Sequence, residues 1–90
     1  MEEWDEYIEE AVNTLGKSFD THDVIKKVAH LNQKKYILAL AGIDSDTPFK
    51  SFHSSLGRRI KVVCQQLGFT GQDSRSKDMF DQASKCQTWS

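Results

Sequence analysis

The side chains best suited to chemistry lie between Asp46 and Asp73, a stretch that contains no acidic residue. A helical wheel drawn at about 100° per residue places five of them together, opposite the apolar face: Lys50, Ser54, Arg58, Lys61 and Gln65. Lys and Arg bind phosphates, and Ser and Gln hydrogen-bond to base edges in the major groove of DNA. The pattern therefore predicts a helix that binds double-stranded DNA. The alternative is an ordinary solvated helix face, on which basic residues are also common.

The net charge of −1 hides an uneven distribution of charge. Six of the thirteen acids lie in the first ten residues, and the rest of the chain carries twelve basic residues against seven acids, a balance of +5. Four cations of the central segment are the expected phosphate ligands: Lys50, Arg58, Arg59 and Lys61. Four phosphate contacts predict a slope of about −3.6 for log K against log salt concentration.

No other set of residues indicates a reaction or a bound cofactor. The candidate metal ligands are scattered through the chain without the short ligand pairs of a zinc site: His22, His30, His53, Cys64 and Cys86. We therefore expect no metal, and we expect both cysteines to be reduced thiols. Cys64 and His53 lie at the edge of the apolar arc and are predicted to be structural. Hydrolase, metalloprotease, P-loop and dinucleotide motifs are absent, so we expect no catalytic residue, no enzymatic activity and no small-molecule substrate.

Three helices are expected before this central segment. Apolar residues recur every three or four positions from 2 to 15, with acids on the other faces. Asp20 and Asp23 then form a capping-box pattern, and Phe19 and Val24 occupy the positions of a hydrophobic staple. A second helix should start there and stop at Asn32. A third helix is expected at 33–41, where it would bury Tyr36, Ile37 and Leu40.

A fourth helix and a hairpin complete the predicted fold. Thr47-Pro48 is a helix start, and six apolar residues from Phe49 to Leu67 have helical spacing up to Gly68. Gly57 lies within this helix, which would suit close packing against a neighbour. Weak strand signals follow at 77–81 and 85–89, with a turn at 82–84 and buried contacts from four residues: Met79, Phe80, Cys86 and Trp89. Such a hairpin would be a wing that carries Arg75, Lys77 and Lys85. These elements predict a mainly helical, winged-helix-like bundle of three to four helices with a short C-terminal β-hairpin.

Two other uses of these surfaces stay open. Within the same fold, the third helix could be the one that meets DNA, through residues at its start: His30, Asn32, Gln33, Lys34 and Lys35. In a different functional class, the acidic helix 2–15 could bind a protein partner, and its apolar stripe could form a homodimer surface. The aromatic residues Trp4, Tyr7 and Trp89 are interpreted as core side chains in preference to a subunit contact.

Length and composition predict the number of domains and the location of the protein. A chain of 90 residues fits one domain, here 1–90, because a second domain could not bury enough surface. No apolar run approaches the roughly 18 residues of a membrane span, and the acidic N-terminus is unlike a secretory signal. We therefore expect no membrane association and a cytoplasmic location.

Three segments of the chain resemble a group of small bacterial proteins of winged helix-turn-helix type, often found in phage-like or accessory gene contexts. They are Phe19–Leu40, Pro48–Arg59 and Met79–Trp89. The resemblance implies that the stretch ending in Leu56-Gly57-Arg58 opens the recognition helix and that Trp89 closes the wing. It is compatible with a role in transcription regulation but transfers no established activity. The group has a glycine where this chain has Asp81, so the turn is expected to differ there.

Overall fold

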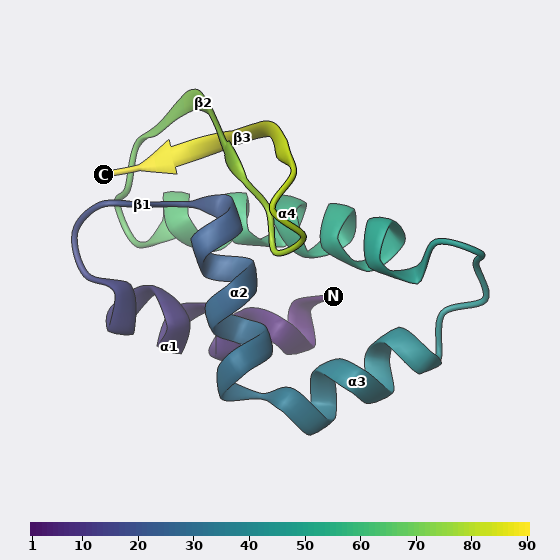
Figure 1. The fold of residues 1–90 in the computed structure, drawn as a ribbon. Coiled ribbons are helices and arrows are strands. Elements are labelled where there is room, and N and C mark those ends of the chain that lie inside the picture. The colour runs from purple at the N-terminus through teal and green to yellow at the C-terminus, as the bar shows by residue number, and fades with distance from the viewer.

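A computed structural model describes every residue from Met1 to Ser90, and its elements are shown in Figure 1. The helical elements are η1 (Glu2–Trp4), α1 (Asp5–Leu15), α2 (Thr21–Leu31), α3 (Gln33–Ala41) and α4 (Pro48–Gln66). The strands are β1 (Phe19–Asp20), β2 (Gly71–Lys77) and β3 (Ala83–Trp89). The predicted mainly helical bundle with a C-terminal β-hairpin is confirmed. None of the helices has the length and apolar character needed to cross a bilayer.

The helix boundaries follow from local chemistry. The Asp20 carboxylate accepts the backbone N–H of Asp23 at 2.8 Å, and the Asp23 carboxylate accepts the N–H of Asp20 at 2.9 Å. This reciprocal pair satisfies two N–H groups that would otherwise have no partner at the start of α2. Helix α4 begins at Pro48, where the missing proline N–H costs nothing. Both predicted starts are confirmed.

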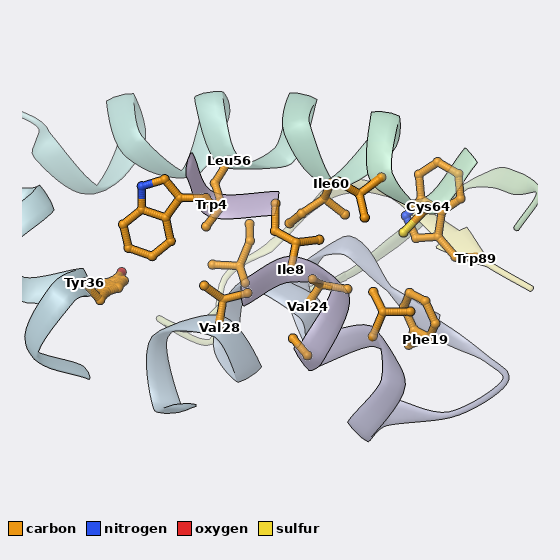
Figure 2. Packing of buried hydrophobic residues seen from close by; sticks show 14 of the residues in the cluster. Trp4, Ile8, Phe19, Val24, Val28, Tyr36, Leu56, Ile60, Cys64 and Trp89 are labelled. Atoms are coloured by element: carbon orange, nitrogen blue, oxygen red, sulfur yellow. The ribbon is translucent and has the colours of Figure 1, made fainter. Parts of the chain in front are cut away.

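All fifteen buried residues belong to one hydrophobic cluster, and no polar or charged residue is buried. Ile8, Leu56 and Ile60 are fully buried between α1 and α4. Figure 2 shows Trp4 and Tyr36 at one end of the cluster and Phe19 and Trp89 at the other. Trp4 is 6% exposed and Trp89 1% exposed. The prediction that both tryptophans are core residues is therefore confirmed.

Several predicted core positions are instead exposed. Ile37 is 64% exposed, because α3 faces the core with Tyr36, its one buried residue, and with the partly buried Ala39 and Leu40. Phe49 and Leu67, at the two ends of the apolar arc of α4, are 41% and 39% exposed. The prediction of a buried apolar arc is correct over the middle of α4, where the neighbouring helices cover it. It is wrong at the two ends of the helix, which are exposed. Leu31, at the end of α2, is exposed for the same reason.

The sheet has three antiparallel strands in the order β1-β3-β2. The two-residue strand β1 pairs with the end of β3, placing Phe19 opposite Trp89, and was not predicted. In the hairpin, Gly71 lies opposite Trp89 and Lys77 opposite Ala83. The predicted first strand at 77–81 is wrong, because most of that segment forms the turn, and the predicted turn at 82–84 lies largely within β3. Figure 1 places the sheet at the top of the view and α1 and α3 at the bottom.

The hairpin turn is built on Asp78. Its carboxylate accepts the backbone N–H groups of Phe80 at 2.8 Å and Gln82 at 3.1 Å. These hydrogen bonds, with that from Gln82 as the larger effect, hold the pKa of Asp78 below its usual range. Asp81 adopts φ 63°, the left-handed region that favours glycine. A glycine at this position would therefore adopt the turn conformation with less strain than Asp81 does.

Candidate nucleic-acid interface

The polar face of α4 lies open to solvent along the helix. The five residues that the wheel groups together are all exposed: Lys50, Ser54, Arg58, Lys61 and Gln65. The opposite side of the same helix is held in the core by Leu56, Ile60 and Cys64, each 0% exposed. Core packing therefore fixes the rotation of α4 and leaves its polar side outward. From Lys50 to Gln65 this face extends about 22 Å at 1.5 Å per residue.

Arg59 does not belong to this face. It projects from another side of α4 and donates from Nε to Asp5 Oδ1 at 2.6 Å and from Nη2 to Asp5 Oδ2 at 2.8 Å. This two-point contact neutralises the guanidinium, and it holds the pKa of Asp5 below its usual range. The interpretation of Arg59 as a phosphate ligand is corrected accordingly. Its position at about 280° on the wheel could have separated it from the other cations.

The hairpin carries three further cations. Arg75, Lys77 and Lys85 are all exposed, and Arg75 lies directly opposite Lys85 across the two strands. Like charges in directly opposite positions destabilise a sheet, so these two side chains repel each other in the absence of an anion. Lys77 forms an exposed ion pair with Asp81 at 3.3 Å.

The start of α3 offers a less complete surface. Lys34 and Gln33 are exposed, but Lys35 lies over the Tyr7 ring with Nζ 5.0 Å from its centroid. Asn32 donates from its side chain to the Val28 carbonyl at 3.1 Å. Gln33 also donates from its side chain to the His30 carbonyl at 3.2 Å, so three of the polar residues considered for a second DNA-binding surface are engaged within the protein.

A cleft of about 780 Å³ lies between α4, the start of α2 and the hairpin turn. Phe49 of α4 meets Phe80 of the turn edge to face, with ring centroids 4.8 Å apart. Lys50 and Ser54 also line this cleft. The hairpin turn consequently rests against the first half of α4, and the polar face of the helix continues into the cleft.

His53 has the structural role that its wheel position predicts. Its Nε2 atom hydrogen-bonds to the Tyr36 hydroxyl, which also reaches Met79 Sδ at 3.6 Å. Burial lowers the pKa of His53 and raises the pKa of Tyr36 to about 12. The three side chains join α4, α3 and the hairpin turn.

The two cysteines differ in their surroundings. Cys64 is fully buried, as predicted, and burial raises the pKa of its thiol to about 11. Cys86 is half-buried on β3 and lies near two residues from the start of α2, Asp20 and His22. One potential ligand atom from each of these three residues lies within 4.8 Å of the others. Sequence spacing could not reveal this grouping, because it depends on how β1 and α2 meet the hairpin.

Comparison of the chain with protein family models, with curated proteins and with solved structures found no significant match.

Proposed function

We propose that this protein is a non-enzymatic, winged-helix-type module that binds double-stranded DNA, with α4 as its recognition helix. The proposal rests mainly on one observation, the acid-free polar face of α4, whose five residues are all exposed. Arg, Lys, Gln and Ser are the residues that read base edges and hold phosphates. A DNA major groove about 12 Å wide admits a helix presenting such a face.

The order of the elements supports the same proposal. A helix, a short strand, further helices and a two-stranded hairpin follow one another, and α4 is the helix directly before the hairpin. In a winged helix this is the recognition helix, and the hairpin is the wing. The opposed cations Arg75 and Lys85 would gain from a phosphate between them, since an anion relieves their repulsion. A role as a regulator of transcription is the corresponding biological proposal.

The test is fluorescence anisotropy with a labelled DNA duplex at low and at moderate salt. The double variant Arg58→Glu/Lys61→Glu should weaken binding at least about tenfold, because it replaces two phosphate ligands with repelling charges. The matched variant Lys17→Glu/Lys34→Glu alters net charge equally on exposed positions elsewhere and should bind nearly as well as the unaltered chain. Equal losses in both variants, or no binding of the unaltered chain at low salt, would contradict the proposal.

A second candidate is a protein-interaction domain that uses α1. The observation in its favour is a row of exposed acids on η1 and α1: Glu2, Glu3, Glu6, Glu9 and Glu10. The apolar stripe of α1 is not the contact, because Ile8, Ala11 and Val12 are buried in the core, and its interpretation as a dimer surface is wrong. A partner for α1 would therefore be basic. This candidate predicts no duplex binding at either salt concentration, whereas Glu6→Lys/Glu10→Lys should preserve or strengthen duplex binding under the first proposal.

A further inference from the structure

Asp20, His22 and Cys86 bring three different ligand types to one place. Asp20 caps α2, His22 lies in the first turn of that helix, and Cys86 is at the middle of β3. A carboxylate oxygen, an imidazole nitrogen and the thiol sulfur lie within 4.8 Å of one another. No other group of three or more His, Cys, Asp or Glu side chains in the chain comes together in this way.

The capping role of Asp20 leaves one of its carboxylate oxygens free to coordinate a metal ion. Its Oδ1 atom accepts the backbone N–H of Asp23 in the capping box. No hydrogen bond within the protein reaches Oδ2, so this oxygen is available to a cation. Helix α2 thus holds the carboxylate in a fixed orientation without using both of its oxygens.

Both nitrogens of His22 contact serine hydroxyls of the hairpin. Nε2 lies 3.0 Å from Ser84 Oγ, and Nδ1 lies 2.8 Å from Ser76 Oγ. Ser76 Oγ is also 3.5 Å from Cys86 Sγ, so this hydroxyl contacts both the imidazole and the thiol. When Nε2 donates its proton to Ser84, Nδ1 accepts from the Ser76 hydroxyl, and an ion that takes the place of this hydroxyl meets the Nδ1 lone pair. Metal-binding histidines usually donate their other N–H to an oxygen in this manner, which fixes the tautomer and the ring orientation.

We propose that Asp20, His22 and Cys86 bind one Zn²⁺ ion or a similar divalent transition metal. Thiolate and imidazole ligands favour such ions over Mg²⁺ and Ca²⁺, which take oxygen ligands. Zinc bonds of 2.0–2.3 Å imply ligands about 3.3–3.8 Å apart, so the three groups close by about 1 Å when the ion replaces the Ser76 hydroxyl. Cys86 binds as the thiolate and releases its proton to solvent.

Metal binding at this site has a mechanical consequence. The ion joins the start of α2 to the centre of β3 and so secures the hairpin to the helical bundle. Three protein ligands leave a fourth position for water or another small ligand, as in zinc sites that are not purely structural. The inference does not depend on DNA binding, since none of the contacts used here involves a residue of the polar face of α4.

Co²⁺ titration of the full, reduced chain tests the site, because tetrahedral Co²⁺ gives visible d–d bands and a thiolate ligand adds a charge-transfer band. We expect one Co²⁺ per chain, displacement of Co²⁺ by Zn²⁺, and loss of the charge-transfer band in Cys86→Ser. His22→Gln removes a ligand and should weaken binding by more than the roughly 10- to 100-fold loss that follows a change in an outer-shell partner, while the glutamine can still hydrogen-bond to the serines. Asp20→Asn should also weaken it, with α2 intact because Asn caps as well as Asp.

Two further measurements make the result decisive. His30→Gln, an exposed histidine outside the site, should bind Co²⁺ as the unaltered chain does. The Tm of the unaltered chain should rise with Zn²⁺ concentration, and that of Cys86→Ser should not, because only a folded-state site stabilises the fold. The proposal is overturned if excess Co²⁺ gives no tetrahedral spectrum, or if the charge-transfer band survives in Cys86→Ser.

Discussion

Gly71 has no room for a side chain, because a Cβ atom there would lie 2.7 Å from the Trp89 ring. Trp89 is 1% exposed and cannot move aside without disturbing the core. Gly57 is the opposite case. A Cβ atom on Gly57 would meet only Thr21 Cγ2, at an ordinary 3.8 Å, so the close packing expected from the sequence is absent at this position. The surroundings of Gly71 therefore exclude a side chain, whereas those of Gly57 have room for one.

Alanine substitution at the two glycines should shift stability in opposite directions. Gly71→Ala forces the Trp89 ring to shift and should lower the free energy of unfolding by about 1–3 kcal/mol. Gly57→Ala removes backbone freedom within α4 and should raise it by about 0.5–1 kcal/mol. Urea denaturation followed by circular dichroism measures both, and each variant is the control for the other. Changes of the same sign would contradict the packing described around one of the two residues.

His53 makes the stability of the fold depend on pH. Burial is the main cause of its lowered pKa, His22 acts in the same direction, and Asp78 opposes them. The folded state therefore binds the proton less readily than the unfolded chain, in which the pKa is near 6.5. The contribution of neutral His53 is complete above that value and is lost as the pH falls below it.

We expect the Tm to fall between about pH 7 and pH 5, and His53→Gln to reduce that fall because glutamine does not titrate. Differential scanning calorimetry across this range measures the effect. His30→Gln is the matched control, since it makes the same substitution at an exposed histidine that does not contact His53. If His53→Gln and the unaltered chain show the same pH dependence, His53 is not the responsible group.

At the scale of elements, the sequence predicts best where the signal is local. The capping box at Asp20, the helix 33–41 and the proline start of α4 depend on neighbouring residues, and all three are found as expected. The sequence does not predict the correct position of the first hairpin strand, because β2 alternates serine with charged residues and contains no apolar side chain. The apolar pair Met79-Phe80 lies in the turn instead. Met79 contacts Tyr36 of α3, whereas Phe80, predicted to be buried, is 51% exposed and meets the Phe49 ring of α4 edge to face.

Of the two candidate sites, one follows from a local sequence pattern and the other depends on tertiary contacts. The polar face of α4 follows from helical periodicity, so its five residues could be named from the sequence. The Asp20, His22 and Cys86 cluster could not, because 64 positions separate His22 from Cys86. The pairing of Arg59 with Asp5 likewise joins α1 to α4 across 54 positions. Such contacts depend on how the elements pack, which periodicity alone does not determine.

Across the whole molecule, the main acidic cluster and the acid-free basic helix are different elements of the fold. Five exposed acids gather on η1 and α1, whereas α4 has exposed cations and no acid, and the hairpin carries three exposed cations beside the exposed Asp73 and Asp81. The net charge of −1 is the balance of twelve basic and thirteen acidic residues over the whole chain, and it describes neither surface. The DNA phosphates are attracted by the protein charges nearest to them and not by the net charge of the protein. The reason is that salt limits the reach of each charge to about 8 Å at physiological ionic strength. The Asp5–Arg59 pair is the point where the two surfaces meet.

The salt dependence of duplex binding should therefore report particular cations and not the total. Lys61→Gln removes one phosphate contact and should reduce the slope of log K against log salt by about 0.9. Asp5→Asn/Arg59→Gln removes a neutralised pair without altering net charge, and it should leave the slope unchanged. Anisotropy titrations at four or more salt concentrations, with each variant first checked for folding by its Tm, give the slopes. An equal reduction in the two variants would mean that Arg59 leaves Asp5 to contact the duplex, and the interface would then extend over the boundary between α4 and α1.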